Sequence, residues 1–396
     1  MLRITQATQA YAWGSSNALQ DTLALTHDGV LAEAWMGAHP SAPSLVLDDG
    51  LDDLVELLRQ TPREALGLDV VNRFGPQLPY LLKVIAAEHP LSLQVHPHID
   101  AARAGYDAED AAGVPIDAPH RNYKDRNHKP ELVYALTQFE AMCGFRAPRR
   151  AAEMFADLDC PLAKELHGIL VEKPSTEGIR EAFTRLLDPA TRPGPEEVAR
   201  LAEAVAARLA DGSPSPRTDR TVGLLQREYP GDPGVVTSML LNPVTLQPGE
   251  AMFVPAGGVH AYLHGVGVEI MASSDNVLRA GLTPKHVDVP ELLRNVDYVA
   301  APPIRIAPEV FHGATKVFYA PVDDFELSVT ELADDDDHPL PGRGPRILLA
   351  LAGELTVATS NDGTVTLTQG QAAFVPASDG RLTVRGRGRL VQADVP

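Results

Sequence analysis

An internal repeat constrains the fold of this chain more than any other feature. Residues 246–256 (LQPGEAMFVPA) align with residues 367–377 (LTQGQAAFVPA), and seven of the eleven positions are identical. Both copies have a glycine-containing turn, a short apolar strand and a proline at the strand end, where the missing N–H is tolerated. A pattern that returns 121 residues later predicts two related β units in one chain.

The two copies diverge after the proline. The first continues through Ala256-Gly-Gly-Val to His260, and this order of turn, strand, proline and histidine resembles the second conserved motif of cupin barrels. The second continues to Arg381 and has no histidine at that place. The resemblance implies two jelly-roll β-barrels, of which only the first keeps a metal site.

The chain also contains a zone with helical spacing of its apolar residues. Helices are expected from about Ser175 to Leu187 and from Pro195 to Ala210, the second ending before Asp211, followed by a loop at 212–220. We therefore predict a mainly β protein with a helical insertion. The expected units are 1–150 (first part of the catalytic cupin domain, with a short helix at 51–59), 151–220 (α-helical domain), 221–310 (rest of the catalytic domain) and 311–396 (C-terminal cupin-like domain without metal ligands).

Composition and charge limit the partners. The chain has 396 residues, 44% hydrophobic and 22% charged, as in ordinary globular proteins. No apolar run approaches the roughly 20 residues that cross a bilayer, and the N-terminus lacks a signal-peptide core, so we expect a cytoplasmic protein without a membrane partner. The net charge of −19 argues against nucleic acid, although a few converging Arg and Lys side chains could still bind a small phosphorylated ligand. With only Cys143 and Cys160, a cysteine-rich zinc site is excluded.

Residues 91–97 (LSLQVHP) place an amide and an imidazole on one side of a predicted strand. Because side chains alternate along a strand, Gln94 and His96 face together with Ser92, while Leu91, Leu93 and Val95 face the other side. Taken alone, this pair fits two hydrogen-bonded core residues better than a metal site.

Two distant residues extend the pair to a ligand set. His260 follows the repeat motif, and Glu131 opens an apolar strand in residues 127–133 (NHKPELV), where a ligand is easier to explain than a surface carboxylate. The proposed set is Gln94, His96, Glu131 and His260. Its mixed nitrogen and oxygen donors favour zinc, with manganese, cobalt or iron as alternatives. His98 and His128 are the rival ligands, although His98 follows a proline that should end the strand.

Essentially from end to end, the chain resembles type I phosphomannose (mannose-6-phosphate) isomerases of the cupin superfamily. The segments that carry the resemblance are 11–15 (YAWGS), 32–40 (AEAWMGAHP), 91–97 (LSLQVHP), 127–131 (NHKPE), 143–146 (CGFR), 260–262 (HAY) and 274–285 (SDNVLRAGLTPK). The resemblance implies one zinc ion at Gln94, His96, Glu131 and His260, and an essential Arg279.

The implied reaction interconverts D-mannose 6-phosphate and D-fructose 6-phosphate by proton transfer between C1 and C2 through an enediol. A cation with one carboxylate and three neutral ligands can polarise the substrate oxygens. Candidates for the base are Lys129, Glu269 and Asp275. Lys129 is preferred because it lies two residues before Glu131, on the same side of the strand.

The phosphate and sugar contacts are predicted from neighbouring residues. Arg279 and Lys285 flank a loop that contains glycine and proline, which could turn both cations toward one anion. Arg279 would meet the substrate oxygens or the enediolate, and Lys285 with Ser92 would hold the 6-phosphate. Tyr262 would line the sugar pocket, and residues 104–126 would form a loop near its mouth.

Two other classes of function stay open at this point. A cupin oxidoreductase with iron and dioxygen would leave Gln94 and the cations unexplained, whereas a non-catalytic sugar-phosphate sensor would keep the anion pocket and could lose the base. The sequence also leaves open the oligomeric state, for which a monomer is expected, and the direction of flux, whether toward glycolysis or GDP-mannose.

Overall fold

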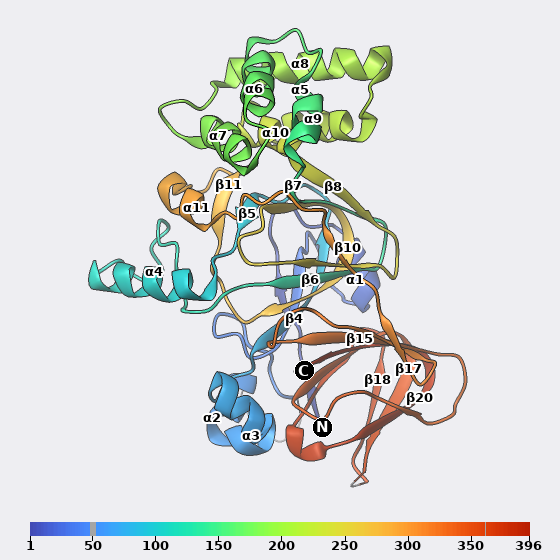
Figure 1. Cartoon of the computed structure of the whole chain (residues 1–396). Helices are drawn as coiled ribbons and strands as arrows, with labels where there is room; N and C mark the ends of the chain where they lie inside the picture. The colour runs from blue at the N-terminus through green and yellow to red at the C-terminus, as the bar shows by residue number, and fades with distance from the viewer. Residues whose placement is uncertain (48–52, 361) are drawn as a thin grey trace.

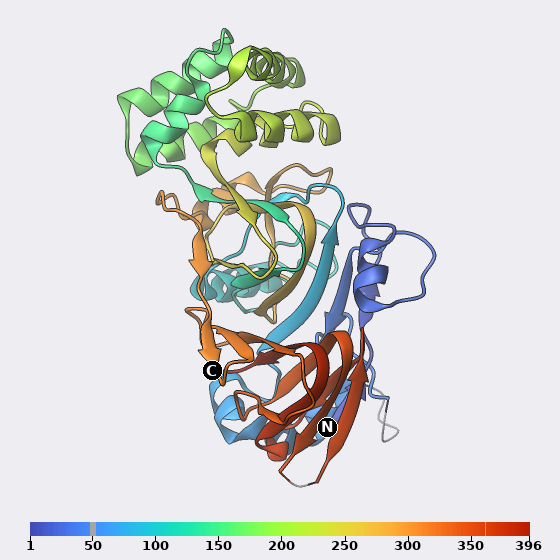
Figure 2. The ribbon, with the colours of Figure 1, turned by 90° about the vertical axis from the view of Figure 1, so that its right-hand side faces the viewer.

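The computed structural model describes residues 1–47, 53–360 and 362–396 and contains three regions. Two β domains lie next to each other, and a group of helices covers the far end of the first (Figure 1). In the orthogonal view the three regions form a row, with the helices at one end and the C-terminal sheet at the other (Figure 2). The prediction of a mainly β protein with a helical insertion is confirmed.

The first β domain, here called the catalytic barrel after the role expected for it from the sequence, is built around one long strand. That strand, β10 (His260–Ala272), pairs with β4 (Tyr80–Ala87) and β6 (Glu131–Ala135) through its second half and with β5 (Leu93–Val95) and β7 (Phe139–Phe145) through its first half. The remaining strands are β2 (Ala7–Gln9), β3 (Glu33–Met36), β8 (Leu241–Leu246), β9 (Ala251–Val254), β11 (Leu278–Gly281) and β12 (Ile304–Ile306).

Gly265 lies where β10 passes from one set of partners to the other. Its φ is +125°, and a Cβ there would be 2.6 Å from the carbonyl oxygen of Gln138. Only glycine fits this point without a local shift. The strand can therefore carry His260 on one part of the barrel and Glu269 on another.

Alternation along β4 and β6 separates the barrel interior from a second core. Lys83 and Ile85 point inward, whereas Leu82 and Val84 belong to an apolar cluster shared with the second β domain. Glu131 likewise faces inward. Because side chains alternate along a strand, the polar residues of β4 and β6 face the barrel interior. The apolar residues on their other face pack against the second β domain.

The second β domain, here called the C-terminal barrel, contains the other copy of the repeat. Its strands are β1 (Leu2–Ile4), β13 (Glu309–Phe311), β14 (Thr315–Phe318), β15 (Glu326–Leu332), β16 (His338–Pro339), β17 (Arg346–Thr359), β18 (Thr364–Thr368), β19 (Ala372–Val375) and β20 (Leu382–Asp394). Its β19 corresponds to β9, and the glycines of the two turns, Gly249 and Gly370, have φ angles of +92° and +81°. The repeat therefore marks equivalent strands.

The first strand departs from the predicted division of the chain. Residues 1–150 were expected in the catalytic barrel, but β1 pairs with β19, with Leu2 opposite Phe374. The N-terminal amino group also binds the Asp379 carboxylate at 2.6 Å. Three residues carry too little pattern to indicate which sheet they join, so the sequence could not reveal this pairing.

The helical region is longer than the sequence indicated. It contains α5 (Pro148–Phe155), α6 (Pro161–Glu172), α7 (Thr176–Leu187), α8 (Pro195–Gly212), α9 (Pro216–Glu228) and α10 (Gly234–Thr237), followed by a 3-10 turn at Ser238–Leu240. The helices expected near 175–187 and 195–210 are confirmed, although α8 runs two residues further, to Gly212. The loop expected at 212–220 is wrong, because α9 begins at Pro216, where the first helical position tolerates proline. Strands return only at β8.

Shorter helices flank the barrels. These are α1 (Ala18–Leu23), α2 (Leu54–Gln60), α3 (Pro62–Phe74), α4 (Ile99–Ala111) and α11 (Val289–Asn295). Of the helix expected at 51–59, residues 51 and 52 lie outside the described residues. The expected loop at 104–126 is partly wrong, since α4 continues to Ala111. No helix in the described ranges is both long and apolar enough to cross a membrane.

Candidate metal centre

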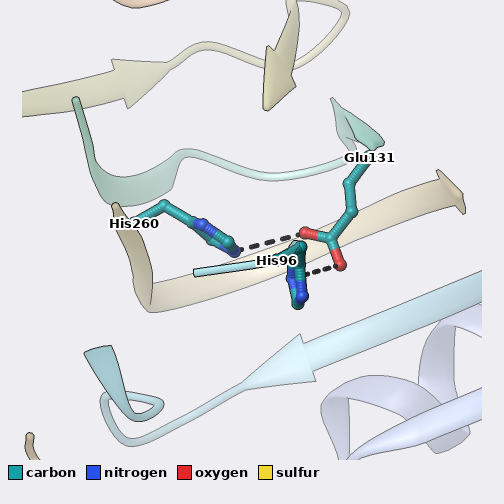
Figure 3. Close-up of side chains that lie close together, drawn as sticks. All are labelled: His96, Glu131 and His260. Carbon is teal, nitrogen blue, oxygen red and sulfur yellow. Dashed lines mark ion pairs between the residues drawn. The ribbon is translucent and has the colours of Figure 1, made fainter. Parts of the chain in front are cut away.

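Three side chains from distant parts of the sequence meet inside the catalytic barrel. Nε2 of His96 lies 3.2 Å from Oε1 of Glu131, and Nε2 of His260 lies 3.3 Å from its Oε2 (Figure 3). One ligand atom from each residue falls within 4.8 Å of the others. All three are almost fully buried, with Glu131 at 1% exposure and both histidines at 0%.

Strand pairing brings Gln94 to the same place. Gln94 on β5 is the register partner of His260 on β10 and, on its other side, of Arg279 on β11. Its Nε2 lies 3.3 Å from Nε2 of His260, and a half-turn of the amide would exchange its nitrogen for its oxygen. All four predicted ligands therefore converge.

The alternation predicted for residues 91–97 holds in part. Leu93 and Val95 face away from the metal centre and pack into the core of the helical region, so the helices cover the outer side of β5. Leu91 packs instead beside the cluster inside the barrel, contrary to the prediction. The reason is that β5 begins only at Leu93, and residues outside a strand do not follow its alternation.

Backbone carbonyls fix both imidazole rings. Nδ1 of His96 lies 2.7 Å from the carbonyl oxygen of Asn276, and Nδ1 of His260 lies 3.0 Å from that of Gly258. A carbonyl can only accept, so each Nδ1 carries the proton and donates it. Each Nε2 is left with a lone pair directed at the Glu131 side of the site, as a metal ligand requires.

Electrostatics keep His96 and Glu131 in the protonation states that bind a metal. Burial, and then the charge of Lys129, lower the pKa of His96 to about 4. Burial alone would raise the pKa of Glu131, but the charge of Lys129 and the close contacts with His96 and His260 hold it well below its usual range. At neutral pH His96 is thus a neutral imidazole and Glu131 an ionised carboxylate.

This donor set fits zinc. Two imidazole nitrogens, a carboxylate and an amide oxygen match the borderline character of Zn²⁺, which protein sites usually hold with four ligands. The rival ligands lie elsewhere. His98 is exposed before α4, and Nε2 of His128 lies 3.1 Å from both carboxylate oxygens of Asp324 in the C-terminal barrel.

The three candidate bases occupy different surroundings. Nζ of Lys129 donates to Oε1 of Glu131 at 2.6 Å and lies 3.5 Å from Nε2 of His96. Glu269 is 4% exposed, and its pKa is raised to about 7 by burial and then by Glu131. The Asp275 side chain is 41% exposed and approaches Nε2 of His39 at 3.4 Å.

Lys83 was missed in the sequence. Its Nζ lies 3.5 Å from Glu269 and 3.9 Å from Glu33, and it faces the ring of Trp35 at 4.7 Å from the centroid. Burial would lower its pKa, but the surrounding carboxylates, led by Glu33, raise it above its usual value. A single lysine in the apolar run 80–86 was the available signal, since a charge in a buried strand needs a partner.

The predicted substrate contacts lie at different depths. Arg279 is half-buried on β11, and its guanidinium has no hydrogen-bond or ion-pair partner among the described residues. Lys285 is exposed, and its pKa is lowered by partial burial and then by the charge of Arg279. Ser92 is half-buried just before β5.

Tyr262 lies deeper than expected for a residue that lines a sugar pocket. It is 2% exposed, it packs against the ring of Phe139, and its hydroxyl donates to Oε2 of Glu131 at 3.4 Å. This position suits a residue that holds Glu131. Contact between Tyr262 and the sugar stays a prediction.

Comparisons with known proteins identify the family. The profile of the phosphomannose isomerase type I catalytic domain matches residues 1–148, and that of the mannose-6-phosphate isomerase cupin domain matches residues 314–395. The mannose-6-phosphate isomerase of Escherichia coli K12 is 39% identical over 397 residues, with 99% of each chain covered. The human enzyme is 31% identical and covers 94% of this chain and 92% of its own length.

Solved structures agree. The apo form of mannose 6-phosphate isomerase from Salmonella typhimurium superposes with a TM-score of 0.88 at 38% identity, covering 99% of this chain and 98% of that one. A mannose 6-phosphate isomerase bound with zinc and yttrium gives the same TM-score and identity. The prediction of a cupin fold is confirmed, and with near-complete coverage at this level of identity the chain belongs to the type I mannose-6-phosphate isomerase family.

Proposed function

We propose that this chain is a zinc-dependent aldose–ketose isomerase that interconverts D-mannose 6-phosphate and D-fructose 6-phosphate. The observation that carries the proposal is the buried cluster of His96, Glu131 and His260 in a chain that matches mannose-6-phosphate isomerases over its whole length. Arg279, which has no partner among the described residues and lies on the strand next to Gln94, supplies the anion-binding group that such a substrate needs.

Gln94, His96, Glu131 and His260 would hold one zinc ion. When bound, zinc supplies a positive charge that stabilises the negative charge developing on the substrate oxygens. The chain contributes the rest of the environment. Carbonyls orient both imidazoles, Tyr262 supports Glu131, and burial excludes water from His96, Glu131 and His260.

Proton transfer between C1 and C2 needs a group that can both accept and donate. We propose Lys129 for this role, because the residue is only 7% exposed and its Nζ lies beside two of the ligands. Glu269 and Asp275 are the alternatives. The raised pKa of Glu269 suits acid–base exchange, and the exposure of Asp275 gives it access to a substrate.

The anionic end of the substrate is assigned to the cations around β11. Lys285 with Ser92 would hold the 6-phosphate, and Arg279 would meet the sugar oxygens or the enediolate. Half-burial of Arg279 without a partner in the described part of the chain supports this assignment, since a desolvated guanidinium gains from an anionic ligand.

A coupled assay with chelated and zinc-restored protein tests the function. We expect isomerase activity to disappear on removal of zinc and to return on its addition. Full activity in fully stripped protein would refute the proposal. Binding of the sugar phosphate without turnover in the zinc-loaded protein would instead favour the sensor.

We also propose that the chain acts as a monomer, since all four predicted ligands and the candidate bases come from one chain. A sedimentation experiment tests this directly. A cytoplasmic location and a role in GDP-mannose synthesis stay predictions.

A further inference from the structure

One buried amide, Asn276, connects the segments that carry the metal centre. It is 0% exposed and lies in the loop between β10 and β11, where its backbone carbonyl receives the proton of His96 Nδ1 at 2.7 Å. In the sequence it stands out only as part of a family motif. Its contacts give it a separate role.

The side chain of Asn276 satisfies all of its hydrogen-bonding capacity within one neighbouring segment. Its Oδ1 accepts from the backbone N–H groups of Lys124 at 2.7 Å and Asp125 at 3.3 Å. Its Nδ2 donates to the carbonyl oxygens of Asp125 at 2.9 Å and Asn127 at 2.8 Å, and to Oδ1 of Asp125 at 3.1 Å. Only a group with both donors and acceptors can make this set of contacts.

Asp125 binds back to the loop that carries Asn276. Its carboxylate accepts from the backbone N–H of Asp275 at 2.8 Å and from Oγ of Ser274 at 2.9 Å. The backbone N–H of Asn127 adds a third bond at 2.8 Å. Two loops are thus joined in both directions, through the buried Asn276 and Ser274 on one side and the half-buried Asp125 on the other.

The joined loops lead directly into the proposed site. One continues from residue 127 to Lys129 and Glu131, and the other continues from Asn276 to Arg279. His96 donates its Nδ1 proton to the backbone carbonyl of Asn276, where the two loops meet. The contacts of this single amide therefore bear on ligands that come from two different strands.

We propose that Asn276 is a positioning residue for the metal centre, which sets the orientation and tautomer of His96 through its own carbonyl and the register of Glu131 through its side chain. This rests on the proposed zinc site. Partners that orient metal ligands typically contribute about 10–100-fold in metal affinity.

The test replaces Asn276 with Asp and measures zinc affinity by competition with a chelator. The N276D side chain keeps the two bonds to backbone N–H groups, but it places a carboxylate against two carbonyls and the Asp125 carboxylate. We expect the dissociation constant for zinc to rise about 10–100-fold. At saturating zinc, kcat should fall while KM changes little, because the phosphate contacts are intact.

The metal-free protein supplies a second readout. With ¹⁵N-labelled histidine, the wild-type protein should show His96 protonated at Nδ1, and N276D should show a mixture of tautomers. A His96 tautomer and a zinc affinity that both match those of the wild type would overturn the proposal. Absence of zinc binding by the wild type would instead refute the zinc site itself.

Asn295 offers a matched control. It is 5% exposed, and its Nδ2 also donates three hydrogen bonds, to the hydroxyl of Tyr123 and to the carbonyl and carboxylate of Glu291. Among the described residues it contacts no predicted ligand. N295D should lower stability and leave zinc affinity unchanged, so an equal loss of affinity in both variants would show a merely structural effect.

A milder variant keeps the proposal testable if N276D does not fold. Ser274→Ala removes the hydroxyl that bonds Asp125 and that also accepts from the backbone N–H of Asn276 at 3.2 Å. We expect a smaller loss of zinc affinity, about 3–10-fold, in the same direction. An unchanged affinity in this variant would contradict the proposal.

Discussion

Replacing Arg279 with Ala should separate stability from function. The guanidinium is half-buried, burial lowers its pKa, and it has no protein partner among the described residues. Removing this unpaired, desolvated charge should either raise the free energy of unfolding or lower it by no more than about 0.5 kcal/mol. Urea denaturation of the metal-free protein measures this value.

The effect on catalysis should be much larger. A hydrogen bond to a charged group contributes about 1.5–3 kcal/mol, which corresponds to a loss of roughly 10–150-fold in kcat/KM. If Arg279 meets the enediolate, kcat falls and the inhibition constant of inorganic phosphate stays the same. Lys285→Met should show the opposite pattern, with weaker phosphate inhibition and little change in kcat.

Two results would refute this reasoning. A fall of more than about 2 kcal/mol in the stability of the Arg279→Ala variant would mean that the guanidinium has a structural partner. Loss of zinc, measured by metal analysis, would mean that Arg279 supports the ligands and not the substrate. Arg279→Lys serves as the control, because it keeps the charge and loses the forked geometry.

Three further changes test other parts of the structure. Lys129→Met should lower turnover at least about 100-fold while the protein retains its zinc. Steady-state kinetics and metal analysis measure these two quantities, and a wild-type kcat would exclude Lys129 as the base. Asp324→Ala removes the acceptor of His128 and should lower unfolding free energy by about 1–3 kcal/mol, an effect that should vanish in a His128→Ala background. Burial raises the pKa of Asp394 in the folded protein to about 8, whereas an unfolded Asp has a pKa of about 3.9. The protonated carboxyl therefore contributes its full stability below the unfolded pKa, and this contribution is lost as the pH rises through 8. Asp394→Asn should therefore flatten the decline of the urea midpoint between about pH 5 and 8, and an unchanged decline would contradict the shift.

Much of the candidate site could be predicted from the sequence because its ligands lie in local patterns. Gln94 and His96 share a face by alternation, His260 follows a repeated motif, and Glu131 interrupts an apolar strand. Each of these local patterns predicts a side-chain direction in the folded protein, since strand geometry fixes where alternate side chains point. The helices with clear apolar spacing were predictable for the same reason.

The contacts that could not be predicted are those between segments without a local signal. Lys83 is one charge in an apolar run, and its partner Glu269 lies on a strand 186 positions away in sequence, paired with it by register. Asn276 resembles an ordinary turn residue until the loop at 124–127 is placed beside it. Helix α9 could not be predicted because only two of its apolar residues, Val222 and Leu225, are buried, which is too few to give a helical pattern.

The pairing of β1 with β19 has a consequence for synthesis on the ribosome. The N-terminal amino group and its partner Asp379 are 378 positions apart, so at about 5–20 residues per second β1 waits roughly 20–75 s for its neighbour. During this time Ile4, which is 2% exposed in the finished fold, can pair only with Val46, its partner in an isolated antiparallel bridge. The nascent chain therefore carries β1 without its sheet partner β19 until the C-terminal barrel emerges, so a bulky N-terminal fusion would interfere with this late pairing.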